Sequence, residues 1–310
     1  MVSMNGGFGG ETELLNPKAW KRAWKRNTLP YWYSYKISVA GSKIGDAVNF
    51  NLPPVKTCAN GVPCTREGCY AIKAYSAYPS AKAAMECNLA LLRQDSGFEF
   101  LIESMKRALR TRRKDGERKF SLCRFHVNGD LGIKEGDTAS GVAYLGAICE
   151  IARTCTHVRF WMYTKQYEIL SKYKGSIPPN LCIIVSCWGE FNPFQVTKDQ
   201  FKTGDLKSGL DGSGKNVAEN EEGEIPELEM PPVDETYAEL ADRFPLAYLD
   251  DGSKIGEMIN MKIQKKVGLN DKPPKICPCT DYTEIITRCE TCKLCWDGSL
   301  KGTNLAFRKH

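Results

Sequence analysis

Apolar residues recur with a helical period in several stretches of the chain. Val142, Leu145, Ile148 and Ala152 lie on one face when residues 142–154 are wound as a helix, so their spacing predicts an amphipathic helix there. The stretches with this period are residues 75–94, 97–114, 142–154 and 167–173. They alternate with shorter apolar runs, whose residue types differ from those of the helical stretches.

The shorter runs are rich in β-branched and aromatic residues and predict strands. They cover residues 120–127, 157–163 and 181–186, with a further candidate at 245–249. Leu181 to Val185 is apolar throughout, which is typical of a strand covered on both faces of a sheet. Strands that alternate with helices at this spacing predict parallel βαβ units. We therefore expect an α/β fold with a complete or partial parallel (βα) barrel of the TIM-barrel type.

The ends of the chain differ from this middle part. Residues 1–30 predict a glycine-rich tail and a short helix at 18–26, and residues 31–52 predict a hairpin or a first strand. The barrel domain is expected over 31–270, and a cysteine-rich segment over 271–310. Residues 203–235 are rich in Gly, Ser, Asn, Glu and Pro, which predicts an acidic insertion at the rim of the barrel.

Charge and hydropathy restrict the location and the partners. The net charge is +6, and a basic cluster from Lys106 to Lys114 is interpreted as a solvated helix end, because no aromatic residues interleave it as in a nucleic-acid interface. No run of about 18 apolar residues is present, and residues 1–16 lack an apolar signal core. The pattern favours a cytoplasmic protein that binds no membrane, and a nucleic-acid patch is the less favoured interpretation of the basic cluster.

Fourteen cysteines are many for such a chain, and two groups have the spacing of metal ligands. The first is Cys58, Cys64 and Cys69, in a loop over residues 58–69 with the spacing C-x5-C-x4-C. Free thiols prefer burial, so three of them in a polar loop favour metal ligation over three unrelated thiols. Their soft sulfur donors suit an iron–sulfur cluster or zinc. Three thiolates leave one iron of a [4Fe-4S] cluster open for another ligand.

The second group lies near the C-terminus. It consists of Cys279, Cys289, Cys292 and Cys295, with the spacing C-x9-C-x2-C-x2-C. Tandem C-x2-C spacing is typical of cubane-binding loops, although a tetrathiolate zinc site has similar spacing. Cys277 is left out because it flanks the same proline as Cys279, and its role stays open. We expect one or two [4Fe-4S] clusters, since the two groups could also converge on one site.

The six remaining cysteines fall in predicted helices or strands and are expected to be mostly buried core thiols. They are Cys87, Cys123, Cys149, Cys155, Cys182 and Cys187. Cys187 differs from the others, because it follows the end of a predicted strand.

Several short motifs, in one order from about Asn51 onward, resemble the phage "gene product 88" family of uncharacterised proteins. They are Leu52-Pro53-Pro54, Cys58…Cys64…Cys69-Tyr70-Ala71, Arg124-Phe125-His126…Gly129-Asp130, Phe160-Trp161…Tyr163-Thr164-Lys165 and Cys289…Cys292…Cys295-Trp296. The resemblance implies a phage or prophage origin and a place in the host cytoplasm. It implies no particular activity.

A more distant resemblance is to radical S-adenosylmethionine enzymes, which place a three-cysteine loop after the first barrel strand. In that comparison Asn128, Gly129 and Asp130 correspond to the motif at the end of the second strand that holds the methionyl amine. The resemblance therefore implies a [4Fe-4S] cluster and these three residues as cofactor-binding. Here the loop reads C-x5-C-x4-C instead of C-x3-C-x2-C, so binding of adenosylmethionine stays open.

Residues at the carboxyl ends of strands are the first candidates for chemistry in a barrel. Asp130 and Lys165 are the predicted catalytic residues, although Asp130 also suits a turn beside Gly129, and Lys165 also suits a surface position. His126 is expected to share the inward face with Arg124 and Asn128 by strand alternation, with packing on a helix as the alternative.

Three functions remain compatible with these features. The first is an iron–sulfur enzyme of radical or redox type, which acts on a small-molecule substrate or accepts electrons from a donor. The second is a non-catalytic iron–sulfur protein that senses redox state or binds a host or phage protein. The third is a zinc protein that binds nucleic acid.

Overall fold

The computed structural model describes residues 34–39, 47–58, 69–186, 240, 243–250, 275–276, 292, 295 and 305–308 of the 310-residue chain. The chain divides into two compact units, Met1–Ser34 and Tyr35–His310, and the described residues other than Ser34 belong to the second. The expected helix at 18–26, the insertion at 203–235 and most of the segment 271–310 lie outside the described residues.

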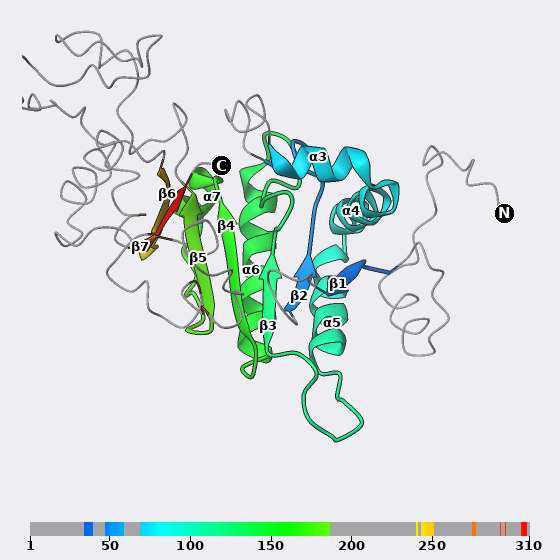
Figure 1. Ribbon diagram of the computed structural model, residues 1–310. Helices are drawn as coiled ribbons and strands as arrows, with labels where there is room; N and C mark the ends of the chain where they lie inside the picture. The colour runs from blue at the N-terminus through cyan, green and yellow to red at the C-terminus, as the bar shows by residue number, and fades with distance from the viewer. Residues whose placement is uncertain are drawn as a thin grey trace, which may run out of the picture. The chain divides into compact units, whose positions relative to one another are not determined.

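A mostly parallel sheet organises the described residues (Figure 1). Its strands are β1 Ile37–Val39, β2 Ala47–Phe50, β3 Leu122–Phe125, β4 Arg159–Thr164, β5 Leu181–Ser186, β6 Leu246–Asp250, β7 Lys275–Ile276 and β8 Leu305–Arg308. They follow the order β1-β2-β3-β4-β5-β6-β8-β7, and β1 is antiparallel to β2 whereas the other neighbours run parallel.

The expected α/β fold with parallel strands is confirmed, and so is the first hairpin. Closure into a barrel is not confirmed, because β1 and β7 stand at opposite ends of the strand order and no pairing joins them among the described strands. The described strands therefore form an open sheet.

The connections place the helices on one side of this sheet. The helices are α3 Tyr70–Ala77, α4 Pro79–Leu92, α5 Gly97–Leu109, α6 Thr138–Thr154 and α7 Tyr167–Lys172. From β2 to β6 the spatial order of the strands follows the sequence, so right-handed crossovers bring successive helices to the same face. Figure 1 shows α6 running behind β3 and β4.

Aromatic packing marks the face that the helices cover. Phe50 of β2 and Phe125 of β3 are register partners with ring centroids 6.2 Å apart, and Phe125 stacks on Phe160 of β4 at 6.1 Å. Tyr35 connects this row to α5, because its ring lies 5.2 Å from that of Phe100. All five side chains are buried, so this interface forms the main apolar core.

The opposite face is more polar. Asn49, Arg124, Trp161 and Cys182 are register partners on β2 to β5, and alternation directs them away from the phenylalanine row. Trp161 is buried there against Ala47 and neighbouring side chains. We call this the helix-free face of the sheet, because the described helices α3 to α7 lie on the other side.

The helix expected over 75–94 is wrong as a single element. The structure has two helices, α3 and α4, which are separated at Tyr78. Pro79 is the first residue of α4, where its missing N–H costs no hydrogen bond, but its ring pushes the preceding residue out of the helical region. Tyr78 accordingly has φ −119° and ψ 93°.

Two other expected elements are shorter in the structure. The helix expected over 97–114 ends at Leu109, and the basic residues beyond it lie in an exposed loop from Arg110 to Lys119 that is closed by a bridge between Arg112 and Arg118. The strand expected over 120–127 covers only Leu122–Phe125.

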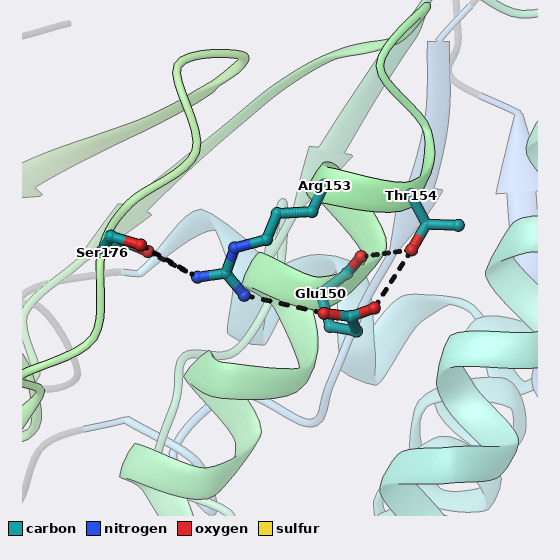
Figure 2. A network of polar contacts seen from close by, with 4 residues as sticks. All are labelled: Glu150, Arg153, Thr154 and Ser176. Atoms are coloured by element: carbon teal, nitrogen blue, oxygen red, sulfur yellow. Dashed lines mark hydrogen bonds and ion pairs between the residues drawn. The ribbon is translucent and has the colours of Figure 1, made fainter.

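Polar contacts fasten the end of α6 to the segment before β5. The Asn180 side-chain amide donates to the carbonyl oxygens of Ala152 and Val158, each at 3.0 Å, which satisfies acceptors that a helix end leaves open. Figure 2 shows a more exposed contact nearby, in which Arg153 Nη2 donates to the Ser176 carbonyl oxygen at 2.7 Å and Nη1 pairs with Glu150 at 3.7 Å. Together these contacts link the C-terminal end of α6 to the segments that precede β4 and β5.

Candidate functional site at the carboxyl edge of the sheet

Four parallel strands, β2 to β5, end at the same edge of the sheet, near α3 in Figure 1. The segments that follow β2, β3 and β4 are residues 51–58, 126–132 and 165–166, and β5 ends at Ser186. Hydrogen bonds join each of these segments to a neighbour. The predicted residues Asn128, Gly129, Asp130 and Lys165 therefore lie in one connected region, as the strand-end rule for parallel sheets leads us to expect.

Asp130 is the centre of these connections. Its side chain is only 5% exposed. Oδ1 accepts hydrogen bonds from the Leu131 amide at 2.8 Å and the Thr164 hydroxyl at 2.6 Å, and Oδ2 accepts from the Lys165 amide at 2.8 Å. Both oxygens are thus used to tie the end of β3 to the end of β4.

The environment of Asp130 acts on its pKa in opposite directions. Burial, the larger influence, raises the pKa of this carboxyl above its ordinary value, whereas the hydrogen bonds from Lys165, Thr164 and Leu131 lower it. The balance is a raised pKa, so deprotonating Asp130 is harder in the folded protein than in the unfolded chain.

Thr57 anchors the first cysteine loop to the same region. Its buried hydroxyl donates to the Pro53 carbonyl oxygen at 2.8 Å and accepts from the Asp130 amide at 2.9 Å. Its carbonyl oxygen accepts from the Gly132 amide and from the Gln166 side chain, each at 3.0 Å. Cys58 follows directly, so these bonds fix the start of the cysteine loop.

Sequence reasoning missed Thr57 and Gln166. A threonine in a polar loop and a glutamine before a helix are common surface residues, and no local pattern distinguishes a buried one. Their role depends on contacts between residues about a hundred positions apart.

Gly129 allows the close approach of the two loops. Its φ of +79° lies in the left-handed region, and a Cβ atom there would be 2.6 Å from the Leu52 carbonyl oxygen and 2.7 Å from Thr57 Oγ1. Gly129 is therefore required for backbone packing, and its cofactor-binding role stays a prediction.

Lys165 extends the network to β5. Its Nζ donates to Ser186 Oγ at 2.9 Å, and the side chain is half-buried. The Tyr167 hydroxyl donates to the carbonyl oxygen of the same serine at 2.7 Å. Lys165 thus lies half-buried at the carboxyl edge, just before α7, and its catalytic role stays a prediction.

The expectation that the His126 side chain points inward is wrong, because the side chain packs on a helix instead. Its φ of +58° breaks the strand alternation, and its Nε2 lies 2.9 Å from the Tyr144 hydroxyl of α6, on the helix-covered side. Burial and, secondarily, the charge of Arg124 lower the pKa of His126 to about 3. The imidazole is therefore neutral at physiological pH.

Four buried side-chain atoms lack a hydrogen-bond partner among the described residues: Asn49 Oδ1, Arg124 Nε, His126 Nδ1 and Asn128 Oδ1. All four belong to β2, β3 or the turn after β3. An unsatisfied buried polar atom costs about 1–3 kcal/mol, so such atoms are rare and their concentration is informative. Asn128 was predicted as cofactor-binding, whereas Asn49 was missed because its strand pattern looks ordinary.

The structure describes only part of each cysteine group. Cys58 and Cys69 are half-buried, and Cys69 immediately precedes α3, where its carbonyl oxygen accepts from the Ile72 amide at 3.1 Å. Cys64 lies outside the described residues, so the predicted three-thiolate arrangement stays a prediction. No group of three or more possible metal ligands occurs within the described ranges.

In the second group, Cys292 and Cys295 are described and half-buried, whereas Cys277, Cys279 and Cys289 are not described. Cys295 packs against the helix-free face, and its Sγ lies 3.0 Å from the Tyr163 hydroxyl. The tail therefore reaches the sheet at β4.

Four of the other cysteines are confirmed as core thiols. Cys87, Cys123, Cys149 and Cys155 are buried, and burial raises the pKa of each thiol. Cys182 is half-buried on the helix-free face, and Cys187 lies outside the described residues. The four buried thiols provide natural controls for the proposed ligands.

The fold defines the chain as a mixed α/β protein, and comparison with protein families assigns it to a class of phage proteins. The family model for Gene product 88 matches residues 13–298, and the chain belongs to that family. This confirms the resemblance inferred from the cysteine and strand-end motifs.

No curated protein and no solved structure was found to match the chain, so these comparisons return no radical S-adenosylmethionine enzyme. Among the described residues, none of the helices has the length and apolar character needed to cross a membrane.

Replacement of Gly129 tests the close approach of the loops. Gly129→Ala should lower the free energy of unfolding by about 2–5 kcal/mol, because it combines left-handed strain with a steric clash. Gly116→Ala is the matched control: Gly116 has φ +86°, but nothing lies within 4 Å of the added carbon, so only the strain of about 1–2 kcal/mol applies. Urea unfolding of both variants provides the measurement, and equal losses would refute the clash.

The neutral state of His126 predicts a loss of stability in acid. Between pH 6.5 and about 3 the unfolded chain binds a proton at this position and the folded protein does not, so unfolding becomes easier as pH falls. The contribution is up to about 1.4 kcal/mol per pH unit. His126→Asn, which tolerates a positive φ, should remove it, whereas His157→Asn should retain it. Urea unfolding from pH 7 to 4.5 measures the slopes; identical slopes in wild type and His126→Asn would contradict the assignment.

Proposed function

We propose that this protein is an iron–sulfur protein whose first cluster is held by Cys58, Cys64 and Cys69, with a redox or radical reaction at the carboxyl edge of the sheet. A [4Fe-4S] cluster bound by three thiolates keeps one iron for a further ligand and supplies one-electron chemistry. The four cysteines Cys279, Cys289, Cys292 and Cys295 are the proposed ligands of a second cluster or of a shared one.

The position of Cys58 carries this proposal. It directly follows Thr57, whose four hydrogen bonds tie it to Pro53, Asp130, Gly132 and Gln166. A soft donor is therefore placed at the edge where parallel α/β proteins bind their ligands, next to other polar groups.

The surrounding residues have distinct proposed roles. Asp130 is a positioning residue, since both of its carboxyl oxygens already bond to protein groups. Asn128 has a buried side-chain oxygen, Oδ1, without a partner among the described residues, which suits a bound ligand. The Lys165 ammonium, held by Ser186, provides a positive charge for a substrate carboxylate, a phosphate or the negative cluster.

A non-catalytic role is the second candidate, and the packing of Cys295 favours it for the C-terminal group. Cys295 lies against the sheet and close to Tyr163, so a cluster at that group would fasten the tail to the sheet. In that case loss of the metal would lower stability and leave any reaction at the first group unchanged.

Iron and labile sulfide in anaerobically purified protein test the proposal. Wild type should be brown, absorb broadly near about 400 nm and contain about four irons per cluster, because thiolate-bound cubanes have these properties. Cys58→Ala and Cys64→Ala should lose the iron of the first group. Cys149→Ala, which removes a buried thiol of α6, should retain the wild-type content.

Other results would reverse this assignment. Colourless protein with zinc by elemental analysis would replace the cluster by a zinc site, and protein without any metal would refute both. Should iron be present, formation of 5′-deoxyadenosine from adenosylmethionine under reducing conditions would distinguish a radical enzyme from a redox or structural protein.

A further inference from the structure

Asn49 and Arg124 form an unusual pair on the helix-free face. They are register partners on the adjacent strands β2 and β3, which places their Cα atoms about 5 Å apart on the same side of the sheet. Asn49 is only 6% exposed, and its Oδ1 accepts no hydrogen bond. Arg124 Nε is also buried and donates none to the described residues.

These two atoms have complementary chemistry but do not satisfy each other. Arg124 presents a permanently charged donor, and Asn49 presents a neutral acceptor. A molecule that accepts a hydrogen bond at one atom and donates one at a neighbouring atom would satisfy both. A hydroxyl group suits Asn49 especially well, because it bonds to either end of a carboxamide.

Contacts on β4 hold the guanidinium in place. Arg124 Cζ lies 5.3 Å from the centre of the Tyr163 ring, an arrangement in which the ring stabilises the cation and limits its movement. The Tyr163 hydroxyl in turn lies 3.0 Å from Cys295 Sγ. The Arg124 donor is therefore held in place by Tyr163, whose hydroxyl contacts Cys295.

We propose that Asn49 and Arg124 form a binding site for a small hydroxylated organic anion. The anionic group, a carboxylate or a phosphate, bonds to the Arg124 guanidinium, and the hydroxyl beside it bonds to the Asn49 amide. Guanidinium groups bind both anions with paired hydrogen bonds, so the two share one recognition chemistry.

Binding of the anion at this site does not require the proposed cluster. Neither side chain contributes a thiol, so binding of the anion does not rest on iron at Cys58, Cys64 and Cys69. A protein that lacks metal would still bind the anion, and the two proposals fail independently.

Calorimetric titration with three probes tests the site. L-Lactate and sn-glycerol 3-phosphate carry both required groups, whereas propionate has the carboxylate of lactate without its hydroxyl. Wild type should bind at least one hydroxylated probe, and which one it binds distinguishes a carboxylate from a phosphate ligand. If lactate binds, it should bind at least about tenfold more tightly than propionate, because a buried amide left unpaired penalises the analogue.

Two variants assign the binding to the pair. Arg124→Met keeps the length of the side chain and removes the charge, so it should weaken binding of either hydroxylated anion by at least about tenfold. Asn49→Leu keeps the approximate shape and should abolish the preference for lactate over propionate or, if the phosphate is the ligand, weaken glycerol 3-phosphate. Arg112→Met, in the exposed loop after α5, is the matched control and should bind as wild type does.

Thermal unfolding without ligand separates binding from folding. Because Asn49 Oδ1 lacks a partner, Asn49→Leu should unfold at the wild-type temperature or above it. Arg124→Met also loses the contact with the Tyr163 ring, so its unfolding temperature should fall by no more than about 2–4 °C. The proposal is overturned if wild type binds neither hydroxylated probe or if Arg124→Met binds as tightly as wild type. A large drop in the unfolding temperature of Asn49→Leu would also overturn it, since that result assigns a structural role.

Discussion

The buried carboxyl of Asp130 is the constraint on which the carboxyl edge of the sheet depends. A polar group this deeply buried is tolerated only when hydrogen bonds replace its lost hydration. Three donors do so, and two of them belong to Thr164, the last residue of β4, and to Lys165, which follows it. The need to satisfy one side chain therefore sets the relative position of two strand ends. The backbone amide of the same residue donates to Thr57, which fixes the start of the loop that carries Cys58.

The two faces of the sheet differ in their residues and in their contribution to stability. The face under the helices is lined by aromatic rings in contact with one another, and it provides most of the described apolar core. The helix-free face carries Asn49 and Arg124 with unsatisfied atoms, at a cost in stability that the aromatic core compensates. Cys295 and the proposed anion site both lie on this second face, away from the aromatic packing that stabilises the protein.

The hydrophobic periodicity predicted the fold class, because it shows which residues of each helix or strand are buried. The parallel strands, the alternation with helices and the gathering of Asp130 with Lys165 all followed from it. It failed where local geometry overrode the pattern: Pro79 divided a helix, and the positive φ of His126 turned a side chain to the other face. Thr57 and Asn49 could not be found, because their importance comes from partners, or missing partners, that are distant in sequence.

A double-mutant cycle between Asp130 and Thr164 tests the central role of the carboxyl most directly. Asp130→Asn, Thr164→Val and the double variant would be unfolded in urea at pH 7, and the coupling free energy obtained from the four proteins. A bond between buried partners predicts that the two losses are not additive, with a coupling of about 1–3 kcal/mol. Additive losses, with a coupling near zero, would show that Asp130 does not hold β3 to β4.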